Sequence, residues 1–188
     1  MEYIPGQTMA SLLKEADWDQ GRSDLYRERI LDALNAFLHF QPEKETVPGP
    51  EGGGLIQHFV LGRDDSTATR YFNNLEKLQG WVNEEVGKSH WGTSPLGPAD
   101  FTSEGLNLCY CDVNLTNFII PDPTDQSLPI CVIDFEHTSW LPFSFLLWEL
   151  RRKYYGEKEV ELSERSGLAI SMKNAHNLSI LGTIMQRR

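Results

Sequence analysis

Apolar residues recur at helical spacing over several stretches of the chain. From Tyr26 to Leu38 they follow intervals of three, four and one, and a second stripe lies within residues 69–86. Further helices are expected from Ser144 to about residue 155, and as one long helix from residue 162 or 163 to about 185. Thr8 and Ser23 are the expected N-caps of a short first helix and of the helix that carries the first stripe.

A different pattern lies between these helices. Residues 118–120 and 130–133 are short apolar runs, and the segment 121–129 between them is rich in Pro, Asp, Thr and Ser. This pattern predicts a β-hairpin. Segments 42–58 and 88–104 are rich in Gly and Pro and are expected to be loops of the same domain. The expected fold class is therefore α+β and mostly helical, as a single domain over residues 1–188.

Net charge, cysteine number and the length of apolar runs argue against some classes of partner and location. The formal net charge of -10 argues against a nucleic-acid partner, since phosphates demand a basic surface. The three cysteines, an odd number, and the lack of a signal peptide favour a reducing, cytoplasmic location. Cys109, Cys111 and Cys131 are expected to be small buried hydrophobic residues. No apolar run is long enough to span a bilayer, so no membrane partner is expected.

The candidate chemistry lies at the hairpin. Asn117 and Asp134 are equidistant from the middle of its turn, so an antiparallel hairpin brings them side by side at its open end. A carboxylate and an amide oxygen held together suit a hard cation such as Mg²⁺, which shares its remaining positions with water and phosphate. Asp112 lies one short loop upstream and is the candidate base for an attacking hydroxyl. The alternative is that these are ordinary turn residues.

The candidate site residues lie in two short segments that resemble the motifs of a known protein family. Residues 110–117 read Tyr-Cys-Asp-Val-Asn-Leu-Thr-Asn and residues 133–135 read Ile-Asp-Phe. They resemble the catalytic loop (His-x-Asp-x-x-x-x-Asn) and metal-binding signature of the aminoglycoside phosphotransferase family, whose fold is that of protein kinases. Fungal members are the most similar. Tyr110 stands where the family usually has His, a residue that mainly supports the loop.

The resemblance implies an ATP-dependent phosphotransferase that acts on a hydroxyl of a small molecule. It implies that Asp112 is the catalytic base, and that Asn117 and Asp134 hold the magnesium ions of bound ATP. Residues 1–6 resemble the hinge between the two lobes of the family fold, and the backbone of Glu2 and Tyr3 would contact adenine. On this reading the chain is the C-terminal lobe, and the N-terminal β-lobe is absent.

The sequence contains no glycine-rich phosphate loop and no strand Lys to pair the phosphates. The chain alone is therefore expected to have little or no kinase activity, and a missing lobe or a protein partner is expected to cover the hinge face. An apolar patch is expected there, around residues 1–6 and 118–133. The alternative function is a non-catalytic kinase-like remnant that serves as a binding module, and a weaker one is a helical interaction domain.

The acceptor is not identified by the sequence. Four acidic residues could form a face for a cationic acceptor, although solvated surface charge is the alternative: Asp64, Asp65, Glu84 and Glu85.

Overall fold

The fold was obtained as a computed structural model, and it describes residues 4–15, 20–62, 66–89, 94–125, 127–154 and 157–187. Its helices are α1 (Met9–Leu12), α2 (Gln20–Leu38), α3 (Leu75–Gly87), α4 (Phe143–Tyr154), α5 (Glu157–Ser166) and α6 (Met172–Met185), with short 3-10 helices η1 (Leu115–Asn117) and η2 (Phe135–His137). Its strands are β1 (Gln7–Thr8), β2 (Asn107–Tyr110), β3 (Phe118–Ile120), β4 (Cys131–Val132) and β5 (Thr138–Leu141). The chain is thus an α+β protein, as predicted, and its described strands form two small sheets rather than the hairpin alone.

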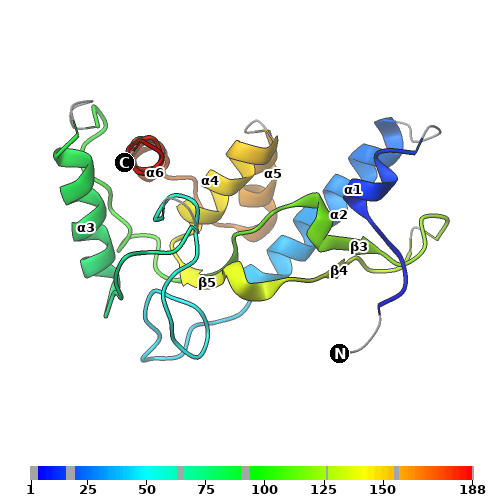
Figure 1. The fold of residues 1–188 in the computed structure, drawn as a ribbon, viewed down its shortest axis with the longest axis horizontal. Helices are drawn as coiled ribbons and strands as arrows, with labels where there is room; N and C mark the ends of the chain where they lie inside the picture. The colour runs from blue at the N-terminus through cyan, green and yellow to red at the C-terminus, as the bar shows by residue number, and fades with distance from the viewer. Residues whose placement is uncertain are drawn as a thin grey trace.

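The longer helices form a row. α3 packs on α6, α6 on α4, α4 on α5 and α5 on α2, which in turn contacts β2 (Figure 1). Salt bridges from Arg165 to Glu28 and Asp32 tie α5 to α2. None of the helices in the described ranges combines the length and the apolar content needed to cross a bilayer.

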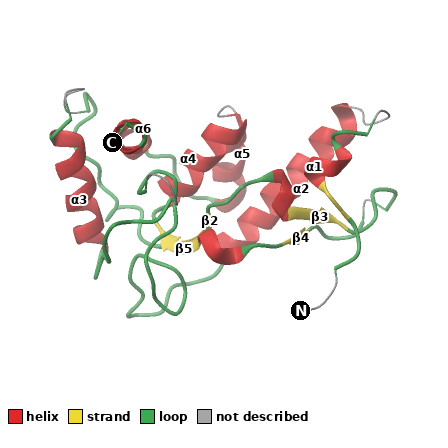
Figure 2. Ribbon diagram, viewed as in Figure 1, coloured by secondary structure: helices red, strands yellow, loops and turns green. Residues whose placement is uncertain are grey.

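The strands lie along one side of this row, as Figure 2 shows. β2 and β5 pair antiparallel with Leu108 opposite Trp140, and β3 lies between β1 and β4 in a second sheet. β4 therefore stands at an edge of its sheet among the described strands. At the other side, Gly6 packs so closely on the hairpin that an added Cβ would lie 2.4 Å from the Ile120 carbonyl oxygen.

Two expected helix starts need correction, while one cap is confirmed. Thr8 accepts a hydrogen bond from the Ser11 amide, as predicted. Ser23 is not an N-cap, because α2 already begins at Gln20. The second helical stripe forms a helix only from residue 75, because Asn74 accepts the Lys77 amide at 2.9 Å and caps it there.

The predicted long C-terminal helix is wrong, because it is two helices. α5 ends at Ser166 and α6 begins at Met172. Gly167 adopts a φ of 72°, a left-handed conformation that ends a helix. Ser171 then caps α6 by accepting the Asn174 amide. The spacing of apolar residues in the sequence did not indicate this break at Gly167.

The segment 42–58 contains no helix, but it is only partly exposed. Pro48, Gly49, Ile56 and His58 are buried, because the segment folds back onto β5 and the core. Gly49 and Trp140 form an isolated antiparallel bridge. The described parts of 88–104 contain neither helix nor strand. Of the candidate acidic face, Asp64 and Asp65 lie outside the described residues, and Glu84 and Glu85 pair with Lys88 on α3.

The hairpin part of the predicted apolar patch is only partly exposed, since Phe118 and Ile120 are buried. Leu128 is exposed, Phe135 just beyond β4 is 53 % exposed, and the other apolar residues from 130 to 133 are half-buried. Ile130 and Val132 line a shallow depression against Ala33 and Phe37 of α2. Residues 1–3, including Glu2 and Tyr3, lie outside the described residues.

Candidate functional site

The predicted hairpin is present. β3 and β4 pair antiparallel with Phe118 opposite Val132. One step further, the Ile133 amide donates to the Asn117 carbonyl oxygen at 3.0 Å, which brings Asn117 next to the residue before Asp134. The turn is anchored to α2, because Tyr26 donates its hydroxyl hydrogen to the Pro123 carbonyl oxygen. The backbone thus brings two of the three candidate residues to the open end of the hairpin.

Asp112 joins this group through Asn117. The Asn117 side-chain amide donates to the Asp112 carboxylate at 2.8 Å and to its backbone carbonyl at 3.2 Å. The loop between them is tightened by Asn114, whose side chain accepts the Thr116 amide and whose carbonyl accepts the Asn117 amide. Because the amide nitrogen faces Asp112, the Asn117 Oδ1 atom is turned away from Asp112 and accepts the Thr116 hydroxyl at 3.2 Å.

Tyr110 supports this arrangement. Its hydroxyl donates to the Ile133 carbonyl oxygen at 2.7 Å, so the end of β2 is fastened directly to the residue that precedes Asp134. Burial raises the pKa of the Tyr110 hydroxyl; the Asn117 side chain lowers it, and the charges of Asp112 and Asp134 raise it further. All three candidate residues therefore act on this one hydroxyl group.

Asp134 has an unusual backbone. Its φ of 62° and ψ of 73° place it in the left-handed region. Among the described non-glycine residues, only Ser66 also has a positive φ. A side chain in this region costs about 1 kcal/mol or more, less for Asp than for bulky residues. Such strained residues cluster at functional sites. Asp134 is exposed, and its carboxylate is available to a ligand.

The residue types of this group suit a magnesium ion better than zinc or calcium. Within the described ranges, neither Asp112 nor Asp134 forms a salt bridge, so two negative charges near Tyr110 lack a cation. The Asn117 Oδ1 atom adds a neutral oxygen. The described residues contain no group of three or more His, Cys, Asp or Glu that could hold a metal. This argues against a zinc or calcium cage, whereas magnesium commonly uses one or two carboxylates, water and phosphate oxygens.

A buried carboxyl group lies near the loop that carries Asp112. Glu149 on α4 is fully buried; its Oε2 atom accepts two bonds from Arg152, at 3.0 and 2.8 Å, and its Oε1 atom has no hydrogen-bond partner within the described chain. Burial raises its pKa from 4.5 to about 7; Arg152 opposes this shift and the negative charge of Asp112 adds to it. Sequence reasoning missed Glu149, because nothing in a helical segment shows that one acidic residue faces inward.

His58 is the second buried ionisable group near this loop. Its ring accepts the Val60 amide and contacts the Phe145 carbonyl oxygen. Burial lowers its pKa from 6.5 to about 3. His58 is therefore neutral at physiological pH and packs against Phe145 and Trp148. His137 adjoins the site through its backbone, because its carbonyl oxygen accepts the Cys111 amide at 3.1 Å.

The cysteines match their expected role in part. Cys109 and Cys111 are buried, and burial raises the pKa of both thiols, so they are poor nucleophiles at neutral pH. Cys131 is only half-buried on β4. Their positions around the loop are those of packing residues.

Comparisons of the chain with protein-family models and with curated proteins found no match. Its functional interpretation therefore depends on the residues described above and on their geometry.

Proposed function

We propose that this chain is a protein-kinase-like catalytic lobe that transfers the γ-phosphoryl group of ATP to a hydroxyl group of a small molecule. The observation that carries the proposal is the contact of Asp112 with Asn117, next to Asp134 at the open end of the hairpin. This contact places the candidate base beside Asn117, whose backbone pairs with the residue before Asp134. The resemblance of residues 110–117 and 133–135 to aminoglycoside phosphotransferases supports the same chemistry.

In this proposal Asp112 accepts the proton of the attacking hydroxyl. One of its oxygens is already held by Asn117, which fixes the orientation of the carboxylate. The hydroxyl oxygen forms a bond to the γ-phosphorus, the bond from that phosphorus to the bridging oxygen breaks, and ADP leaves with the electron pair. Asn117 and Asp134 would hold magnesium, which when bound neutralises charge on the phosphate oxygens.

Tyr110 has a positioning role in this proposal. Its hydrogen bond to the Ile133 carbonyl fixes the backbone next to Asp134, and Asp134 itself adopts a strained left-handed conformation. The family usually has His at this position, and a buried tyrosine hydroxyl performs the same mechanical task here. Catalysis of phosphoryl transfer depends largely on such positioning.

Binding of Mn²⁺ and ATP to the purified chain tests the site, with free Mn²⁺ followed by electron paramagnetic resonance. Asp134→Asn should weaken binding by about tenfold or more, because a carboxylate in contact with the ion contributes several kcal/mol. Asp125→Asn is the matched control, since Asp125 lies in the turn of the same hairpin and its carboxylate accepts hydrogen bonds from the amide and hydroxyl of Ser127. Equal binding by both variants and the unchanged chain would refute the site.

Turnover separates transfer from binding alone. We expect ADP formation with a panel of hydroxyl compounds to be weak and to disappear in Asp112→Ala. Binding of Mn²⁺ and ATP with ADP formation that is unchanged in Asp112→Ala would instead support the alternative function, a kinase-like binding module.

A further inference from the structure

Three side chains of α4 and of the segment around the start of β5 each have a buried polar atom without a hydrogen-bond partner in the described chain. The atoms are Oε1 of Glu149, Oγ of Ser139 and Nδ1 of His137. Glu149 and Ser139 are both 0 % exposed. Native proteins leave few buried polar atoms unpaired, and bound water satisfies many of those that lack a protein partner. We call these three side chains the polar seam.

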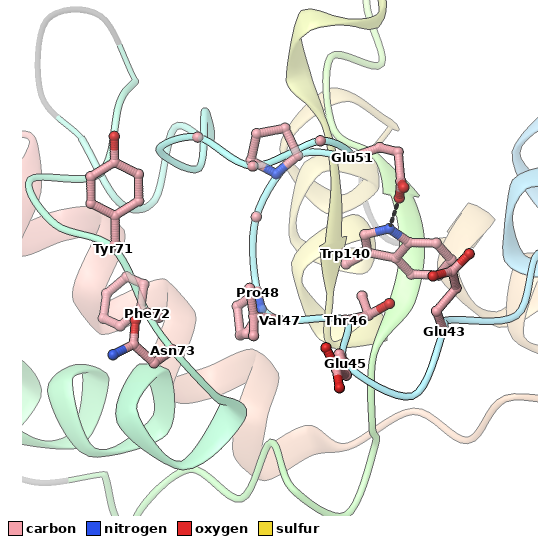
Figure 3. Close-up of a pocket in the computed structure, with 15 residues that line it drawn as sticks. Glu43, Glu45, Thr46, Val47, Pro48, Glu51, Tyr71, Phe72, Asn73 and Trp140 are labelled. Carbon is pink, nitrogen blue, oxygen red and sulfur yellow. Dashed lines mark hydrogen bonds between the residues drawn. The ribbon is translucent and has the colours of Figure 1, made fainter.

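The alternation of β5 places Ser139 on its inner face. Successive side chains of a strand point to opposite faces. Trp140 points toward the loop that carries Glu51, to which its indole N–H donates (Figure 3). Ser139 therefore faces the other way, on the same face as its cross-strand partner Cys109. The Cys109 thiol interacts with the backbone of Leu146, so this face is the one covered by α4.

Glu149 and His137 meet this face next to Cys111. Cys111 lies two residues beyond the strand partner of Ser139, and its thiol interacts with the charge of Glu149. Its amide donates to the His137 carbonyl oxygen at 3.1 Å, so His137 is its neighbour across the strands. The His137 ring also interacts with His58, which packs on Phe145 of α4. The polar seam thus lies in the layer between α4 and the pair formed by β2 and β5.

The three atoms are complementary as hydrogen-bond donor and acceptor. Nε2 of His137 lies 3.6 Å from the Glu136 carboxylate, which favours a proton on Nε2 and leaves Nδ1 as an acceptor. The Ser139 hydroxyl can accept one hydrogen bond and donate another. Oε2 of Glu149 already accepts two bonds from Arg152, so a proton on this carboxyl group belongs on Oε1, where it makes a donor.

The surroundings of Glu149 allow both of its protonation states near neutral pH. Burial raises its pKa to about 7; Arg152 and Lys153 favour the ionised form, and the charge of Asp112 opposes it. The other titratable groups placed in this layer are Cys111, His58 and His137. Of the helices that pack on α4, α5 directs Glu159 to Arg151 and α6 directs Lys173 to Asp100.

We propose that the polar seam is a buried proton-binding site, in which bound water joins the Glu149 carboxyl group to the Ser139 hydroxyl and the His137 ring. A buried water commonly forms about three hydrogen bonds, and the seam offers three polar atoms. As the pH rises, the proton of Oε1 passes to the water, hydrogens shift along the water and the Ser139 hydroxyl to Nδ1 of His137, and Nε2 releases a proton beside Glu136. One proton reaches the solvent, the carboxyl group gains one negative charge, and no electron is transferred.

The path gives the loop that carries Asp112 a charge that follows the pH. Glu149 and Asp112 interact through their charges, and a charge in the protein interior is screened less than one at the surface. A histidine at the outer end of the path can exchange protons with the solvent without unfolding of the core. The proposed site needs neither nucleotide nor metal, so it stands apart from phosphoryl transfer.

The ¹³C signal of the Glu149 carboxyl group and the ¹⁵N signals of the His137 ring, recorded from pH 5 to 8.5, test the proposal. Glu149→Gln assigns the carboxyl signal. We expect Glu149 to titrate with a midpoint near pH 7, and the two ring nitrogens of His137 to shift at the same pH. The same His137 shift in Glu149→Gln would overturn the proposal, since the histidine would then respond without Glu149.

Ser139→Ala removes the middle of the path. The His137 shift at the Glu149 midpoint should disappear, and that midpoint should fall by about half a unit or more, because the protonated carboxyl group loses an acceptor. Ser179→Ala is the control, since the Ser179 hydroxyl donates within α6 to the Ala175 carbonyl oxygen; it should leave both titrations unchanged. A Glu149 midpoint that rises in Ser139→Ala would contradict the proposed direction of the hydrogen bonds.

Water-selective nuclear Overhauser spectra examine the bound water itself. We expect a contact between a long-lived water and the Ser139 β-hydrogens, and its loss in Ser139→Ala together with the coupled titration. The absence of this contact in the unchanged protein would refute the water-filled path.

Discussion

Replacing Glu149 with Gln should change how the free energy of unfolding depends on pH. In the folded protein Glu149 holds its proton up to about pH 7, whereas in the unfolded chain it loses the proton near 4.5. Between these pH values the folded state binds one more proton than the unfolded state. Its free energy of unfolding therefore falls by about 1.4 kcal/mol for each unit by which the pH rises. From pH 4.5 to 7 the total loss is ~3 kcal/mol, and above pH 7 it is constant.

His58 acts in the opposite direction. Its pKa is about 3 in the folded protein and 6.5 in the unfolded chain, so between these values the unfolded state binds the extra proton. Stability then rises with pH by the same ~1.4 kcal/mol per unit. From pH 4.5 to 6.5 the two effects cancel, and together these groups should leave the stability of the unchanged protein nearly independent of pH.

Urea unfolding at a series of pH values from 5 to 8 measures how the free energy of unfolding depends on pH. The Glu149→Gln variant should gain stability relative to the unchanged protein as pH rises, by ~3 kcal/mol in total, and level off above pH 7. The free energy of unfolding of the variant itself should rise between pH 5 and 6.5, because the effect of His58 is no longer cancelled by that of Glu149. Glu164→Gln is the control for an exposed glutamate. A difference between Glu149→Gln and the unchanged protein that stays constant with pH would refute the reasoning.

Two further predictions concern single contacts and the backbone. Tyr110→Phe removes the donor to the Ile133 carbonyl, so urea unfolding should show a loss of ~1–2 kcal/mol, together with weaker binding of Mn²⁺ and ATP; an unchanged unfolding free energy would contradict the role of this hydroxyl. Gly80→Ala and Gly167→Ala should have opposite effects, although an added Cβ meets no atom within 4 Å at either position. Gly80 lies within α3, where Ala should stabilise by ~0.5–1 kcal/mol, whereas Gly167 has a φ of 72°, where Ala should destabilise by about 1 kcal/mol. Changes of the same sign, measured by thermal unfolding, would show that backbone conformation does not decide the outcome.

The sequence predicted the features that depend on near neighbours. The hairpin follows from two apolar runs and the turn residues between them, and the contact of Asp112 with Asn117 spans only five residues. The Thr8 cap is equally local, since Ser11 is three residues away. In these cases the interacting groups are close in the chain, so their spacing contains most of the geometric information.

Features that depend on distant packing were not predicted. Glu149 lies between Trp148 and Leu150, and its burial depends on the helices and strand that surround α4. The segment 42–58 folds back onto β5 because Gly49 pairs with Trp140, which is far away in the sequence. The break at Gly167 was missed because the spacing of the apolar residues around it does not reveal the left-handed φ of this glycine. In each case tertiary contacts or backbone conformation override the local signal.

The edge position of β4 affects association of the protein. An unpaired strand edge can recruit the strand of another molecule and start aggregation. β4 offers only Cys131 and Val132 for such pairing, and Pro129 just before it has no amide hydrogen to donate. A hairpin of this length cannot easily be extended by a second chain. The segment that carries the candidate site can thus keep apolar residues near the surface without acting as a template for intermolecular β-sheets.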